Sequence, residues 1–227
     1  MKTTALLIGD IRFQFKYGFY FLYSIFAVLY ISLLFVLPDI WREEVAILMI
    51  FSDPAAMGLY FMGSIVLFEK SERVLNTIAI SPVKPCEYVM AKLLSIAVVS
   101  TVVGILIGYF GEVISNPFYF IFGVFIGSCL FSAVGLMLAA NIASLNQFII
   151  VTIPAELLIN LPAIAYLFGW KSRWLLFHPG VSIIELCQNG PDALPAVFIL
   201  TLWTALSVLF ACHAVTKSFR SLGGMKL

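Results

Sequence analysis

Two carboxylates stand inside long apolar runs of the chain, where a charged group is costly and usually has a role. Asp53 is the ninth residue of the apolar run 45–68, and Glu156 is the ninth residue of the run 148–168. At 1.5 Å per helical residue, each lies about 12 Å from the start of its run, near the middle of roughly 30 Å of hydrocarbon. A carboxylate at that depth can carry a proton, line a substrate path or complete an internal hydrogen-bond network.

Glu156 belongs to a polar stripe. Thr152, Glu156 and Asn160 recur every four residues, so they share one slowly turning face of a helix. Pro154 and Pro162 bracket this face and leave local carbonyl groups without their helical donors. The stripe must face protein or a hydrated cavity, and two interpretations stay open: an internal hydrogen-bond network, or the lining of a substrate path.

Asp53 directly precedes Pro54. Aspartate is a good N-cap, and proline is favoured at the first position of a helix. We therefore expect a break in the helix at this point, with the Asp53 carboxylate capping the amides of the following half-helix. A transport role for Asp53 is the alternative.

Sequence motifs for enzymatic chemistry are absent. The chain contains neither a G-x-x-x-x-G-K-[ST] phosphate loop nor an H-E-x-x-H or G-x-S-x-G motif, and His178 and His213 have no metal-ligand partner at a useful spacing. The four cysteines are scattered and match no metal-ligand or disulfide pattern. We expect no catalytic residue, metal or cofactor in this chain, which should not hydrolyse ATP by itself.

Charge gathers in one short segment. The chain is 62% hydrophobic and 11% charged, yet residues 68–92 hold seven charged side chains, which are Glu69, Lys70, Glu72, Arg73, Lys84, Glu87 and Lys92. A connection between two membrane spans needs only a few residues. So long and so charged a segment suggests that it has a partner.

The pattern inside this segment predicts a short amphipathic helix over residues 71–80. Val74, Leu75 and Ile78 fall on one side of that helix, and Glu72 and Arg73 fall on another. Glu69 and Arg73 have the spacing of an i,i+4 ion pair. Pro82 disfavours helix at the residue before it, and Pro85 suits the first turn of the next helix. We expect a rigid knob with an apolar ridge that a partner buries.

Six apolar runs of about 20 residues determine the fold class, because each is long enough to cross a bilayer and must satisfy its own backbone there. The sequence therefore predicts an all-α, polytopic membrane protein, with one transmembrane domain over residues 1–227. The predicted spans are residues 19–37, 45–68, 93–110, 118–140, 148–168 and 196–215.

The basic residues indicate the orientation. With the N-terminus inside, ten Lys and Arg residues lie in inner segments and only Arg42, Lys171 and Arg173 in outer ones, which favours cytoplasmic termini. Residues 1–16 suit a helix in the inner interface, with a basic tail as the alternative. The apolar segment 169–195 is expected to re-enter the bundle from outside. The net charge of +1 suggests no nucleic-acid role.

The pattern E-K-S-E-R-V-L-N-T-I-A-I-S-P-V, followed by E-Y-V-M-A-K into a span, resembles the coupling-helix region of type-2 ATP-binding-cassette (ABC) transporter permeases. The starting stretch "DIRFQFKYGFYFLY", together with "FSDPAAMG" and "SLNQF", is most similar to small permease subunits of drug exporters, particularly fluoroquinolone exporters. This resemblance implies a dimeric permease, each copy of which seats its coupling helix in a separate ATPase subunit. ATP and Mg²⁺ would then bind to that partner.

Together these features predict an export permease subunit in the bacterial cytoplasmic membrane, surrounded by lipid and paired with a second copy or a sister permease. The residues expected to couple to the ATPase are Glu69, Glu72, Arg73, Val74, Leu75 and Ile78, and those expected to line the path are Asp53, Thr152, Glu156 and Asn160. The alternative is an ion-coupled secondary transporter that uses Asp53 or Glu156.

Overall fold

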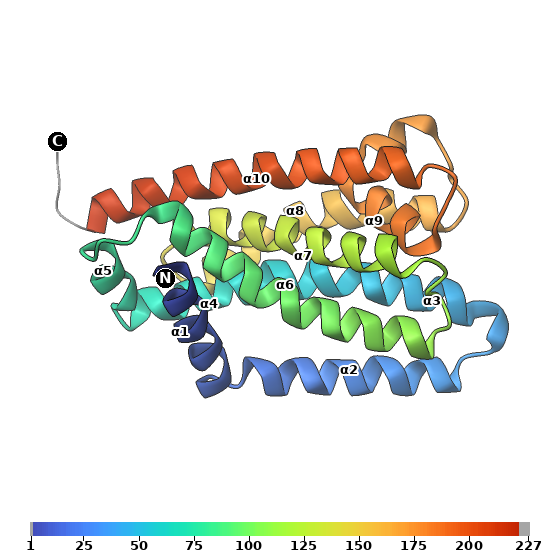
Figure 1. The fold of residues 1–227 in the computed structure, drawn as a ribbon, viewed down its shortest axis with the longest axis horizontal. Coiled ribbons are helices and arrows are strands. Elements are labelled where there is room, and N and C mark those ends of the chain that lie inside the picture. The colour runs from blue at the N-terminus through green and yellow to red at the C-terminus, as the bar shows by residue number, and fades with distance from the viewer. Residues whose placement is uncertain (1, 223–227) are drawn as a thin grey trace.

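The computed structural model describes residues 2–222, and the regular elements in this range are all helices (Figure 1). A helix satisfies its backbone N–H and C=O groups internally, as a chain this apolar requires wherever it meets lipid. The predicted all-α fold is confirmed.

Five long helices run along the long axis of the molecule (Figure 1). Each is long and apolar enough to cross a membrane, and among the described residues no other single helix meets that criterion. They cover five of the predicted spans, although α6 begins well before residue 93 and α10 continues beyond residue 215. The five are α2 (Phe19–Val36), α6 (Pro85–Phe110), α7 (Pro117–Ala140), α8 (Leu145–Leu167) and α10 (Ala193–Leu222).

The remaining predicted span, residues 45–68, is built from three consecutive helical segments rather than one α-helix. These are α3 (Asp39–Ser52), the π-helix η1 (Asp53–Gly58) and α4 (Leu59–Ser71). The expected interruption at Asp53 and Pro54 therefore takes the form of a wider helical turn, without an end to the helix. Such π-helical turns are frequent at functional sites.

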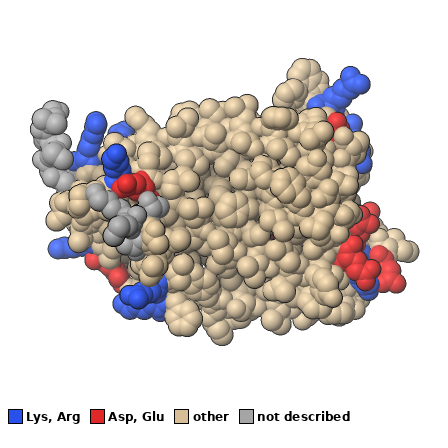
Figure 2. All heavy atoms as spheres, viewed as in Figure 1, with Lys and Arg blue, Asp and Glu red and all other residues tan. Residues whose placement is uncertain are grey.

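Short helices occupy the two ends of the bundle (Figure 1). At one end, called the α5 end, lie α1 (Lys2–Lys16), α5 (Val74–Ala79) and the last turns of α10. At the opposite end lie the 3₁₀ turn η2 (Arg173–Phe177) and α9 (Pro179–Gln188). Charged side chains on the face shown in Figure 2 gather at these two ends and leave an uncharged belt between them.

The middle of the bundle forms around α7, which contacts α4, α6, α9 and α10. Glycines allow these close approaches: a Cβ at Gly127 would lie 2.6 Å from a methyl carbon of Ile183 in α9, and one at Gly135 would lie 2.3 Å from the carbonyl oxygen of Leu59. Residues 179–187 of α9 are all buried. Within the apolar segment 169–195, α9 thus packs into the bundle, whereas Trp170, Trp174 and Phe177 remain largely exposed.

The helix α1 turns two polar side chains towards the protein, while its basic residues Arg12 and Lys16 are exposed. Asp10 and Gln14 are buried, whereas Ile8, Ile11 and Phe15 are exposed. An apolar stripe facing away from the bundle is typical of a helix that lies at a membrane surface.

Candidate functional site

The short helix predicted over residues 71–80 is shorter in the structure, where α5 covers only Val74–Ala79. The helix α4 continues to Ser71, Glu72 follows as its C-cap, and Arg73 adopts a left-handed conformation with φ of 59° before α5 begins at Val74. The backbone N–H of Glu72 donates to the carbonyl of Phe68 at 3.0 Å, which completes the end of α4. The prediction of a single helix over residues 71–80 is therefore wrong, because Arg73 separates two helices with different directions.

Two residues expected to couple to the ATPase are buried inside the protein. Leu75 is 2% exposed and belongs to the apolar core, and Glu69 is 4% exposed. The expected ion pair between Glu69 and Arg73 is not formed, since Glu69 lies beside Lys92 at 2.7 Å. In the described structure, neither Leu75 nor Glu69 is available to a partner.

The exposed face of this region differs from the predicted ridge. Val74 and Ile78 are only partly exposed, while Ile80 is 78% exposed. Ile80 follows Leu75 by five positions, about 140° around a helix, so the burial of one places the other on a different side. We call the exposed residues Glu72, Arg73, Asn76, Thr77 and Ile80 the α5 surface. Sequence reasoning missed Ile80 because the orientation of the helix was unknown.

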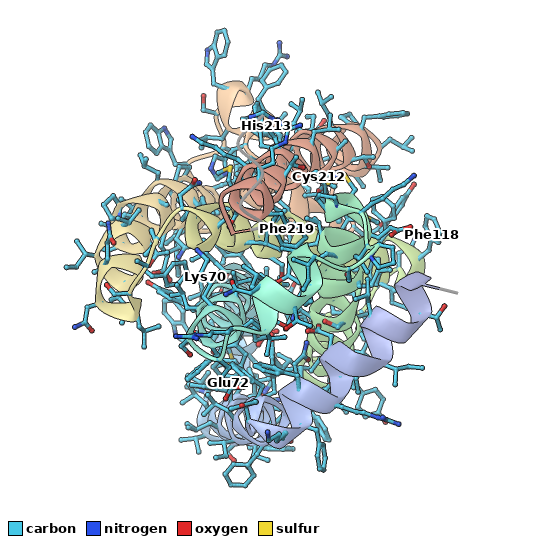
Figure 3. All side chains as sticks on the ribbon, turned by 90° about the vertical axis from the view of Figure 1, so that its left-hand side faces the viewer. Lys70, Glu72, Phe118, Cys212, His213 and Phe219 are labelled. Carbon is cyan, nitrogen blue, oxygen red and sulfur yellow. The ribbon has the colours of Figure 1, made fainter. Side chains whose placement is uncertain are left out.

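The helix that carries the α5 surface packs against the rest of the bundle. The helix α5 contacts both α4 and α10. Figure 3 faces this end of the molecule, with Glu72 labelled at the end of α4 and Phe219 on α10. The hydroxyl of Tyr17 donates to the Glu72 carboxylate, which also ties the end of α1 to this region. This hydrogen bond raises the pKa of Tyr17 above its usual value.

Beneath α5, three buried charges join α1, α4 and α6. The ammonium of Lys92 pairs with Asp10 and, at 2.7 Å, with Glu69. The hydroxyl of Tyr88 donates to Glu69 at 2.6 Å, and the amide of Gln14 donates to Asp10 at 2.8 Å. We call Asp10, Glu69 and Lys92 the buried triad. Its hydrogen bonds matter because an unpaired buried charge is strongly destabilising.

Lys70 connects the end of α4 to the end of α7. Its ammonium donates to the carbonyl oxygens of Ala139, Ala140 and Ile142 at 2.6, 2.9 and 2.9 Å. Carbonyls in the last turn of a helix lack helical donors, so a cation there satisfies them and complements the helix dipole. Much of the charge concentrated in residues 68–92 is therefore used inside the bundle.

The polar stripe on α8 is partly assembled by α4. Tyr60 donates to the Glu156 carboxylate at 2.5 Å and lies close to Thr152, whose own hydroxyl donates to the Phe148 carbonyl at 2.9 Å. The amide of Asn160 lies 3.5 Å from Glu156. Glu156 and Asn160 are partly exposed, so this group is a hydrogen-bonded cluster that remains reachable. The hydrogen bond from Tyr60 to Glu156 was not predicted, because Tyr60 lies on another helix and the spacing of residues within α8 gives no information about it.

Asp53 is fully buried in η1, and among the described residues neither of its carboxylate oxygens has a hydrogen-bond partner. Its φ of −62° and ψ of −56° are helical, so the prediction that Asp53 caps a new helix is wrong. Tyr23 and Tyr30 of α2 lie near enough to interact with it electrostatically. Among the described residues, no hydrogen bond joins Asp53 to the cluster around Glu156.

Comparisons with known proteins place these features in a family. A sequence model of the fluoroquinolones export permease protein family matches residues 2–218. Two relatives named fluoroquinolones export permease protein, from two strains of Mycobacterium tuberculosis, are 25% identical over 157 residues, which is 67% of this chain and 65% of each relative. The match thus spans slightly less than two thirds of the relatives' length. Because the family match covers nearly all of the sequence, the chain belongs to the fluoroquinolones export permease protein family.

Proposed function

We propose that this chain is the permease subunit of an ATP-driven ABC exporter and that a separate ATPase docks on the α5 surface. One observation carries the proposal: α5 is seated on α4 and α10 through buried Leu75, while Ile80 and its polar neighbours remain exposed. A short helix held in this way would pass a displacement on to both long helices. The family relationship supports the export role.

In this proposal the α5 end faces the cytoplasm. Ten of the 13 basic residues lie in the segments assigned to that side, as the positive-inside rule requires. The segments α3, η1 and α4 together make one more crossing, which brings the total to six. In chain order it is the second crossing, between α2 and α6. Both termini and the α5 surface are then cytoplasmic, and α9 lies at the external side.

The working unit would be two permease chains, identical or related, with ATP and Mg²⁺ bound in the ATPase partner. Fluoroquinolones are the first compounds to test as cargo, because the family and the M. tuberculosis relatives carry that name. The Glu156 cluster, with Tyr60, Thr152 and Asn160, would line part of the path. Its partly exposed polar groups can hydrogen-bond to a passing substrate.

A second candidate function is ion-coupled transport, and Asp53 favours it. A buried carboxylate without a described hydrogen-bond partner is costly when charged. A proton or a cation bound there during a transport cycle would relieve that cost. This mechanism would leave the α5 surface without a role, so the ABC assignment accounts for more of the structure.

The docking proposal predicts different results for two substitutions on α5 and beside it. Ile80→Asp places a charge on the α5 surface, where interface anchors typically contribute about 2 kcal/mol or more. We expect ATPase affinity to fall by roughly tenfold or more, with the melting temperature of the permease unchanged. Leu75→Asp should instead lower that melting temperature, because it buries a charge.

The matched control is Ile40→Asp, since Ile40 is 83% exposed and lies at the opposite end of the molecule. Affinity is measured between the purified ATPase and the permease in detergent, alongside thermal unfolding of each variant. Equal affinity of the wild-type chain and Ile80→Asp would contradict docking at this surface. An equal loss of ATPase affinity in Ile40→Asp would show that the loss does not depend on the α5 surface.

A further inference from the structure

An open cavity of about 420 Å³ lies at the α5 end, lined by residues of α1, α4, α5, the following turn and α6. Its volume falls in the range typical of small-molecule sites, about 300–1,000 Å³. Apolar side chains make most of the wall, among them Leu6, Phe13, Val74, Ile78 and Val83. The buried triad supplies the charged part of the wall, since Asp10, Glu69 and Lys92 all line the cavity.

The charge of this wall is unbalanced. The two carboxylates of the triad share a single ammonium, so its formal net charge is −1 when all three groups are ionised. All three are buried, at 3–6% exposure, and among the described residues no second basic side chain pairs with either carboxylate. An excess negative charge in a poorly solvated site attracts a cation more strongly than it would in water.

Aromatic rings help to hold the Lys92 ammonium in the cavity wall. The Lys92 ammonium lies 5.6 Å from the ring centroid of Phe13 and 5.5 Å from that of Tyr88, and both rings line the cavity. The face of an aromatic ring is electron-rich and stabilises a nearby cation. The Asp10 Oδ2 atom already accepts from Gln14 and Ser95, whereas Asp10 Oδ1 and both Glu69 oxygens accept one described hydrogen bond each. A carboxylate oxygen can accept two, so these three oxygens retain capacity for a donor from a ligand.

We propose that this cavity binds an amphipathic organic monocation. The apolar part of the ligand fills the space between Phe13, Val74, Ile78 and Val83, and its cationic group lies beside the carboxylates of Asp10 and Glu69. The inference goes beyond the proposed function, because such binding requires neither ATP nor a partner subunit. It places a ligand directly against Val74 and Ile78 of α5, the helix that carries part of the α5 surface.

Gly9 provides a selective way to fill the cavity. It lines the cavity, and a Cβ built on it meets no atom within 4 Å. Gly9→Trp should therefore occupy the site without displacing the backbone and leave the buried triad intact. Gly9→Ala is the matched control, because it changes the same helix position but adds only one carbon.

The test uses three probes of the same shape and different charge: 4-phenylbutylammonium, 4-phenylbutanol and 4-phenylbutyrate. Their binding to the purified full-length permease is measured by equilibrium dialysis in detergent, against a protein-free detergent blank. We expect the cation to bind most tightly, on the order of tenfold better than the anion. Gly9→Ala should retain this binding, and Gly9→Trp should lose it on the order of tenfold.

Asp10→Asn tests the charge separately, because it makes the triad formally neutral. Its preference for the cation over the neutral probe should disappear, with thermal unfolding recorded to identify a misfolded variant. If Gly9→Trp fails to fold, Val83→Phe fills the cavity from the opposite wall. Equal binding of all three probes, or unchanged cation binding in a folded cavity-filling variant, would overturn the proposal.

The cationic amphiphile could be a free compound or the amine-bearing headgroup of a membrane lipid. Mass spectrometry of the purified chain distinguishes these sources. A lipid ligand should co-purify with Gly9→Ala, be absent from Gly9→Trp and be released by 4-phenylbutylammonium. A free compound should leave no such lipid, while the probe binds without prior delipidation.

Discussion

Lys92→Met should destabilise the permease by about 3–5 kcal/mol, because it leaves Asp10 and Glu69 buried without their shared cation. Asp10 and Glu69 are buried apart from their contact with the cavity, and the triad joins α1, α4 and α6. We expect a large fall in the melting temperature in detergent and poor recovery from membranes. Thermal unfolding followed by size-exclusion chromatography measures both.

The control for this prediction is the exposed ion pair between Arg42 and Asp39, whose atoms lie 2.8 Å apart with Asp39 largely in solvent. Arg42→Met should cost no more than about 1 kcal/mol. A triple variant, Asp10→Asn with Glu69→Gln and Lys92→Met, should recover much of the loss by removing the unpaired charges. Similar melting temperatures for Lys92→Met and Arg42→Met would refute a stabilising role for the triad.

Gly135→Ala should disrupt the contact between α4 and α7. The new Cβ would lie 2.3 Å from the carbonyl oxygen of Leu59, the first residue of α4 after the π-helix η1. Because a backbone atom is in the way, relief requires a shift of a whole helix, at a cost of roughly 1–3 kcal/mol or more. The melting temperature should fall clearly, and transport per folded protein should fall if the geometry of η1 matters.

Gly9→Ala serves as the control for this substitution. It adds the same methyl group where no atom lies within 4 Å, and alanine favours a helix over glycine by about 1 kcal/mol. Its melting temperature should be unchanged or higher. A Gly135→Ala variant as stable as wild type would mean that the two helices are not in the close contact described.

Features that depend on residues close together in the sequence could be predicted. Long apolar runs predict membrane helices because backbone groups cannot remain unpaired in lipid. Pro85 predicts the start of α6, where the Glu87 side chain also accepts from the backbone N–H of Lys84 at 2.9 Å. The burial of α9 agrees with the apolar composition of its segment, but the exposure of Trp170 and Trp174 just before it was not predicted.

Features that depend on distant residues could not be predicted in this way. The i,i+4 spacing predicted an ion pair between Glu69 and Arg73. In the structure Glu69 instead contacts Lys92 and Tyr88, which both belong to α6. The inward direction of Leu75 is set by its packing in the core, so the predicted ridge was turned to the wrong side. At Asp53, local cap preferences favoured a helix start, but the chain continues through the π-helix instead.

The most direct test of the account is the energy source of transport. Inverted membrane vesicles containing the permease and its ATPase are given a fluoroquinolone, with ATP or with an imposed ion gradient. We expect uptake that requires ATP hydrolysis, survives ionophores that collapse proton and sodium gradients, and is lost in Ile80→Asp. Uptake that follows the ion gradient, persists without ATP hydrolysis and is unaffected by Ile80→Asp would contradict this expectation.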